Sequence, residues 1–165
     1  MIPSFKKIAD ELTTLIAEWE IRLENLPEQT VTTRFNSQNR SIRQILGHMV
    51  DSATNNTHRV IHMHYQPSPV VYPDYANLGN NDRWIAIQNY QEEDWTELVR
   101  LWAAVNRHMV HLIGQVDESR LDQQWTSALN EKITLQEMIS DYPRHFKLHI
   151  NEISALINQL TIEHD

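Results

Sequence analysis

The apolar residues of this chain recur at alternating steps of three and four along four long stretches. This spacing places them on one face of an α-helix, so each stretch predicts an amphipathic helix. The stretches cover residues 5–26, 42–63, 95–116 and 135–160, the last running through Leu160. Pro27 ends the first stretch, because proline cannot continue the hydrogen bonding of a helix.

Two of the predicted helices begin with a capping box, in which a hydroxyl residue and an acid or amide three positions later satisfy each other's backbone amides. Ser41 and Gln44 have this spacing at the start of the second helix. Thr134 and Glu137 have it at the start of the fourth helix. The sequence therefore fixes these two starting points closely.

Four amphipathic helices bury their apolar faces best by packing against one another, so we predict an all-α four-helix bundle. At 165 residues, the chain is most economically one domain covering residues 1–165. The second and third helices are joined by a long insert, residues 66–89, rich in Pro, Tyr, Asn and Asp. Inserts of this length are usually functional or capping, and we expect Trp84 and Tyr90 to cover one end of the bundle.

Composition narrows the function classes. The net charge is −8 with no basic block, which disfavours nucleic-acid binding. No run of 18 apolar residues exists, so we expect no membrane span. The chain has no cysteine and its first residues lack an apolar stretch, so we expect a cytoplasmic protein without thiol chemistry of its own. A glycine-rich phosphate loop and a Gly-x-Ser-x-Gly motif are also absent from the sequence, which disfavours nucleotide enzymes and serine hydrolases.

The fourth helix carries two histidines, His145 and His149, one turn apart. They continue the inward series that begins at Leu135, Met138 and Tyr142, so both imidazoles are expected to face the core. Two such rings favour a shared partner, and a metal ion is the obvious one. The alternative is two partly buried histidines that bond to neighbouring groups or water.

A metal site needs a third ligand, and the second helix offers a polar ridge at helical spacing. The ridge consists of Ser41, Gln44, His48, Asp51, Asn55, His58 and His62. Periodicity alone favours the interpretation that this ridge is the solvent face of the helix. In the functional interpretation His48 is the third ligand, and Asp51, one turn later, orients the ring or binds the metal weakly. Spacing does not choose between His48, His58 and His62.

Other features near the histidine pair limit the metal chemistry. No Glu stands three residues before any histidine, and Phe146 stands where a zincin has its catalytic Glu, so a di-iron protein or a helical metalloprotease is disfavoured. Pro143 lies inside the fourth helix and predicts a kink or bulge beside His145. Asn106 is a candidate for lining a pocket. The remaining histidines are interpreted as residues of the surface or the edge of an apolar seam, namely His64, His108, His111 and His164.

These motifs resemble those of the DinB/YfiT-like superfamily of metal-dependent four-helix proteins, over essentially the whole chain. The resemblance is carried by residues 46–53, by Asp141, Tyr142, His145 and His149, and by residues 51–56, 72–75, 82–84, 101–102 and 106–108. It implies that His48, His145 and His149 bind a divalent ion such as zinc, nickel or manganese, with water in the open position. It also implies that homodimers are common. Leu148 stands where close members have a further histidine, and Pro143 where they have an aliphatic residue.

The favoured hypothesis is a divalent-metal-dependent enzyme, a hydrolase or thiol-dependent transferase, that activates a water or a thiol. Its substrate would be a small molecule, and the resemblance implies thiol conjugates among the candidates. Asp51 is the residue expected to handle protons or orient a ligand. A second hypothesis is a non-catalytic, stress-associated bundle that binds a structural metal or a small ligand. A third treats the histidines as ordinary polar residues of an interaction module.

Overall fold

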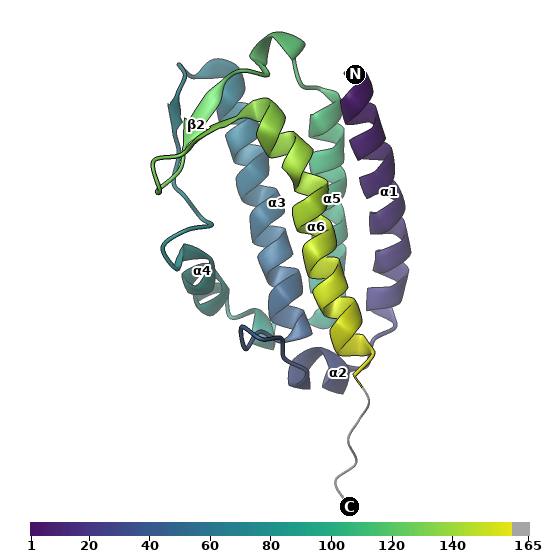
Figure 1. Cartoon of the computed structure of the whole chain (residues 1–165). Helices are drawn as coiled ribbons and strands as arrows, with labels where there is room; N and C mark the ends of the chain where they lie inside the picture. Colours follow the sequence, from purple (N-terminus) through teal and green to yellow (C-terminus); the bar gives the residue numbers. More distant parts are fainter. Residues whose placement is uncertain (160–165) are drawn as a thin grey trace, which may run out of the picture.

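The computed structural model describes residues 1–159, and its core is a bundle of four long helices (Figure 1). These helices are α1 (Pro3–Glu24), α3 (Ile42–Tyr65), α5 (Trp95–Gly114) and α6 (Leu135–Ile157). Each corresponds to one of the four periodic stretches, so the predicted all-α four-helix class is confirmed. Leu160 and His164 lie outside the described residues.

The helix starts follow the local chemistry that the sequence indicates. Ser41 Oγ accepts a hydrogen bond from the Gln44 amide at 3.2 Å, and Gln44 Oε1 accepts one from the Ser41 amide at 2.9 Å. Thr134 and Glu137 exchange the same pair of bonds at the start of α6. Both predicted capping boxes are therefore confirmed, and each satisfies amides that a helix start leaves without partners.

The four helices form a closed ring of neighbours. α1 packs against α5 and α6, and α3 packs against the same two helices. The buried faces meet in one apolar core, whose fully enclosed side chains include Leu12, Leu46, Leu98, Trp102 and Ile153. Because α3 and α6 are neighbours in this ring, polar residues on their facing sides can come together.

Shorter elements decorate the bundle on the outer side of α3 and at its ends (Figure 1). They are α2 (Glu28–Thr33), α4 (Asn80–Gln88), the 3-10 turns η1 (Tyr90–Glu92) and η2 (Glu118–Arg120), and the strands β1 (Val70–Val71), β2 (Gln124–Thr126) and β3 (Lys132–Thr134). The strands form one small sheet in the order β1-β2-β3, with β1 parallel and β3 antiparallel to β2. Periodicity does not predict this sheet, because two- and three-residue strands are too short to show an alternating pattern.

The insert between α3 and α5 is attached to the side of α3. The ring of Tyr90 lies so close to Gly47 that a Cβ atom there would meet it at 2.2 Å, so this close approach requires glycine. Tyr90 Oη also donates to Asp51 Oδ1 at 2.6 Å. Trp84 contacts Tyr75 edge-on, with ring centroids 5.2 Å apart. Tyr90 therefore holds the insert against α3, while Trp84 packs against Tyr75 within the insert, and a role of the two residues in covering one end of the bundle stays a prediction.

Pro143 lies inside α6, which is helical from Leu135 to Ile157 without interruption. Of the predicted kink or bulge, the bulge is absent, and the kink stays a prediction. Proline supplies no amide hydrogen to the carbonyl of Ile139, so α6 lacks one of its regular bonds half a turn before His145. No helix of the described residues is long and apolar enough to cross a membrane.

Candidate metal centre

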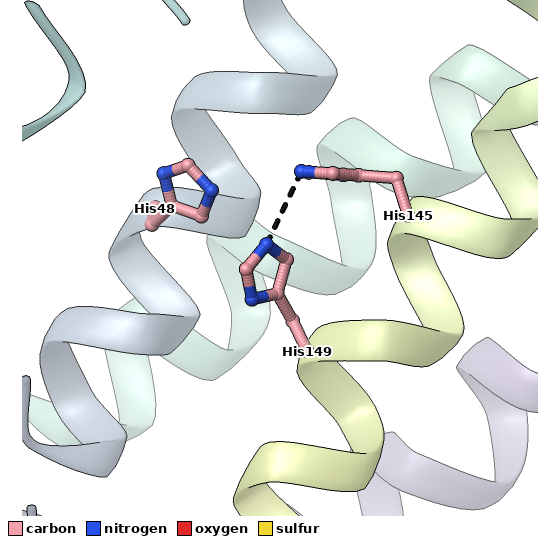
Figure 2. Close-up of side chains that lie close together, drawn as sticks. All are labelled: His48, His145 and His149. Carbon is pink, nitrogen blue, oxygen red and sulfur yellow. Dashed lines mark hydrogen bonds between the residues drawn. The ribbon is translucent and has the colours of Figure 1, made fainter. Parts of the chain in front are cut away.

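Three histidines meet where α3 and α6 face each other. Figure 2 shows His48 on α3 with its ring turned toward His145 and His149 on α6. One ring nitrogen from each lies within 4.8 Å of the other two. The Nε2 atoms of His145 and His149 are 3.1 Å apart, which is the separation that two imidazole ligands have on one ion at about 2.0–2.1 Å.

The other nitrogen of each ring is held by a neighbouring polar atom. The contacts of Nδ1 are His48 with Tyr75 Oη at 2.5 Å, His145 with Ser52 Oγ at 3.5 Å, and His149 with Glu152 Oε2 at 2.8 Å. An ionised carboxylate only accepts hydrogen bonds, so His149 carries its proton on Nδ1 and turns its Nε2 lone pair toward His145 Nε2. This arrangement, with Nδ1 bonded outward and Nε2 facing inward, is the one that metal-binding histidines adopt.

Electrostatics keep the three rings neutral. Burial, together with the neighbouring His149 and His145, lowers the pKa of His48 to about 2. Burial and the neighbouring His149 lower the pKa of His145 to about 4. Burial also lowers the pKa of His149, although its bond to Glu152 opposes the shift. Neutral imidazoles present lone pairs, and three of them suit a divalent metal ion. The residues present therefore fit a metal.

The other candidates for the third ligand lie away from this cluster. His58 is exposed, and half-buried His62 bonds to Tyr65 Oη at 2.7 Å. His108 and His111 are exposed on α5, while His64 bonds to the carbonyl of Val60. Within residues 1–159, His48, His145 and His149 form the one group of three potential ligands. The structure thus brings together the three residues that the family resemblance implies.

The polar ridge of α3 is not a solvent face over its first half. Ser41, His48, Asp51 and Asn55 are all buried, whereas His58 further along is exposed. The interpretation that periodicity favoured is therefore wrong here. The physical reason is that α6, α4 and the 66–89 insert cover this side of α3, and helical spacing within α3 contains no information about that cover.

Asp51 lies on the insert side of α3. Its Oδ1 accepts from Tyr90 Oη at 2.6 Å and from Gln88 Nε2 at 2.7 Å, while Oδ2 has no partner. Burial raises the pKa of Asp51 to about 6, although these two bonds oppose the shift. Among the described contacts, Asp51 bonds to none of the three histidines. Its role in proton handling stays a prediction.

The residues that bond the rings were not identified from the sequence. Glu152 lies three residues after His149 on α6, and Ser52 lies four residues after His48 on α3, so helical spacing could have indicated both. Tyr75 comes from the insert, and no local pattern links it to His48. Asn106, the candidate pocket residue, bonds instead to Tyr142 Oη and the Trp102 carbonyl, both at 2.8 Å, inside the core.

A cavity of about 560 Å³ opens beside the histidine cluster. Its walls include His48, Ser52, Arg59, Tyr75, Trp125 and His145. This volume is in the range of small-molecule sites. The cluster therefore lies at the wall of a space large enough for a substrate.

A four-helix bundle with three converging histidines beside a cavity defines a class of candidate metal-binding bundle proteins. The family model of the DinB superfamily matches residues 11–153, and the chain belongs to this superfamily. The fold is similar to that of YfiT from Bacillus subtilis, described as "a probable metal-dependent hydrolase with an unusual four-helix bundle topology". That match has a TM-score of 0.81 at 18% identity and covers 94% of this chain and 87% of YfiT, which establishes a shared fold. A comparison with curated proteins gives no match.

Proposed function

We propose that this chain is a divalent-metal-dependent enzyme in which His48, His145 and His149 hold one ion. The observation that carries the proposal is the convergence of three neutral imidazoles, two of which, His48 and His145, line a 560 Å³ cavity. Structural metal sites are usually closed by four protein ligands, whereas catalytic sites use three and leave a position for reactants. The three histidines of this chain match the number of protein ligands that catalytic sites use.

The reaction that we favour is hydrolysis of a small-molecule substrate. A divalent ion at such a site lowers the pKa of a bound water or thiol and polarises a substrate carbonyl. YfiT, which shares the fold, is described as a probable metal-dependent hydrolase, and this supports the proposal. The chain has no cysteine, so in thiol transfer, the other predicted reaction, the substrate would have to supply the thiol.

The surrounding residues hold the rings in place and add apolar surface beside them. Tyr75 and Glu152 fix the orientation of His48 and His149 through their Nδ1 atoms. Met138 and Trp125 add apolar surface to the cavity wall. Less water around the reacting groups strengthens the electrostatic interactions between them.

Metal content is the first test. Protein prepared without an affinity tag should contain about one divalent ion per chain, measured by elemental analysis after exchange into metal-free buffer. His48→Ala, His145→Ala and His149→Ala should each lose this ion. His62→Ala is the matched control, because His62 lies on the same helix but outside the cluster, and it should keep the ion. Stoichiometric metal in the His48→Ala protein would contradict the proposed ligand set.

Catalysis is the second test. Metal-loaded protein is screened with esters, amides, lactones and thiol conjugates, before and after treatment with a chelator. We expect a turnover that chelation removes, that added metal restores, and that the His62→Ala control retains. A protein that binds one ion, melts at a higher temperature with it and turns over none of these substrates would instead support the non-catalytic hypothesis.

A further inference from the structure

The cavity contains a buried cation that the proposed metal chemistry does not use. Arg59 on α3 lines the cavity with a side chain that is only 7% exposed. Its Nε and Nη2 atoms have no hydrogen-bond partner. A buried charged group normally has such partners, because leaving them out costs free energy. Stability alone therefore does not explain why a guanidinium with unsatisfied N–H groups is buried at this position.

Asp74, the nearest carboxylate, does not satisfy this guanidinium. Its Oδ1 lies 3.8 Å from Arg59 Nη2, which is beyond hydrogen-bond distance. Both Asp74 oxygens already accept bonds from other donors, namely the amides of Ala76, Asn77 and Ala128 and the side chain of Asn77. Asp74 thus offsets part of the charge of Arg59 but leaves its Nε and Nη2 atoms without a hydrogen bond.

The guanidinium is nevertheless held in place. Its Cζ atom lies 4.2 Å from the centre of the Trp125 ring on β2, a cation–π contact. Nη1 lies 3.5 Å from Asn56 Oδ1, at the limit of a hydrogen bond. Trp125 and Asn56 line the same cavity. A cation held in this way at the wall of a cavity, with two donors that no protein group satisfies, suits an anionic ligand.

Arg59 and the histidine cluster lie toward opposite ends of one helical face. His48, Ser52, Asn56 and Arg59 follow one another at steps of four, four and three on α3, and all four line the cavity. Eleven residues of helix separate Arg59 from His48, which is about 16 Å along the axis. Side chains on a helix lean toward its N-terminus, so Arg59 leans toward His48. An elongated ligand can lie between the two groups.

We propose that Arg59 binds a carboxylate of the substrate, which is therefore a small, elongated organic acid whose reacting bond reaches the three histidines. The position of the reacting bond rests on the proposed function. A carboxylate fits better than a doubly charged phosphate for two reasons. Asp74 already offsets part of the single charge of Arg59, and the exposed carboxylates of Glu131, Glu137 and Asp141 also line the cavity.

The test uses metal-free protein, so that it does not depend on the proposed ion. Hexanoate, its uncharged analogue hexanamide and inorganic phosphate are titrated and followed by ligand-observed NMR and calorimetry. Hexanoate should bind at least about tenfold more tightly than hexanamide or phosphate, in line with the strength of charge-assisted bonds. Arg59→Met should remove this preference. Equal binding of hexanoate and hexanamide, or tighter binding of phosphate, would overturn the assignment.

Lys132→Met is the matched control, because Lys132 is an exposed cation on the wall of the same cavity. It should keep the preference for hexanoate over hexanamide. Loss of the preference in Lys132→Met with retention in Arg59→Met would overturn the proposal.

If Arg59 had a purely structural role, its substitution would change the melting temperature and not the binding of hexanoate. If Arg59 serves ligand binding, Arg59→Met should melt close to the wild-type temperature, because Asp74 keeps its four donors and forms no direct hydrogen bond with Arg59. If Arg59→Met fails to fold, Arg59→Lys retains the charge and should still prefer hexanoate to hexanamide. A lower melting temperature with unchanged hexanoate binding would make Arg59 a structural partner of Asp74.

The two proposals fail separately. If the protein binds carboxylates through Arg59 but never holds metal, the anion site is supported and the proposed metal-dependent function is wrong. If the protein holds one ion per chain but binds hexanoate no better than hexanamide, the metal site is supported and the anion site is wrong. In zinc-loaded protein, suberate, with a carboxylate at each end, should bind more tightly than hexanoate only while Arg59 and His48 are both present.

Discussion

The bundle has two sides that bury different chemistry. The buried residues of α1 are all apolar, and those of α5 are apolar except for Asn106. The facing side of the bundle is different, because α3 buries six polar or charged side chains, namely Arg43, His48, Asp51, Ser52, Asn55 and Arg59. Burying such groups costs free energy unless each finds partners. The apolar burial on the α1–α5 side therefore offsets the free-energy cost of burying polar groups on the α3–α6 side.

The largest expected effect is on the apolar side. Leu12→Ala on α1 removes a fully enclosed side chain and should lower the free energy of unfolding by about 2–5 kcal/mol, because it leaves a cavity in the core. Urea denaturation of the metal-free protein measures this loss. Leu12→Met is the control and should cost less than about 1.5 kcal/mol. A change in metal affinity in the folded Leu12→Met protein would contradict the separation of the two sides.

On the polar side, the largest effect should fall on metal affinity. Tyr75→Phe removes the hydroxyl that bonds to His48 Nδ1 and should weaken metal binding about 10- to 100-fold. Competition with a chromophoric chelator measures the affinity. Tyr65→Phe is the matched control, since Tyr65 makes the same kind of bond to His62 on the exposed part of α3. Equal losses in both variants would show that the effect is not specific to the site.

The buried carboxylate of Asp51 gives a smaller effect that depends on pH. Burial raises its pKa from 3.8 to about 6, so between these values the folded protein holds a proton that the unfolded chain has lost. Stability from this group is therefore fully present below about pH 4, falls as the pH rises to about 6, and stays lower above it. Asp51→Asn should recover about 1–2 kcal/mol at pH 8 and remove this fall.

Denaturation of wild-type and Asp51→Asn proteins between pH 4 and 8 measures that difference. Asn keeps an oxygen that can accept the bonds from Tyr90 and Gln88, so the insert should stay in place. A variant that is less stable at pH 8 than at pH 5, relative to wild type, would contradict the prediction.

The smallest effect should come from an ion pair that links the two sides at the surface. Lys147 on α6 and Glu11 on α1 lie 2.7 Å apart, and both side chains are nearly half exposed. Lys147→Gln should lower the free energy of unfolding by less than about 1 kcal/mol, because water and salt screen exposed pairs. Denaturation at low and high salt measures it. A larger loss that persists at high salt would contradict a surface role.

The sequence could predict whatever depends on neighbours along the chain. The capping boxes at Ser41 and Thr134 need only three residues of spacing, and both are present in the structure. His145 and His149 share a face because a helix repeats nearly every four residues, and they do lie together. The short sheet with Trp125 was missed, since strands this short show no periodicity.

By itself, then, the sequence determined the four helices, their apolar faces and the pairing of two imidazoles, because all of these follow from contacts within one or two turns. Only the tertiary structure decided that α3 faces α6. It also decided that His48, rather than His58 or His62, lies next to His145 and His149. It alone also brought Tyr75 to His48 and enclosed Arg59 against Trp125. Such contacts depend on how helices and insert pack side by side, and spacing along a single helix carries no information about that packing.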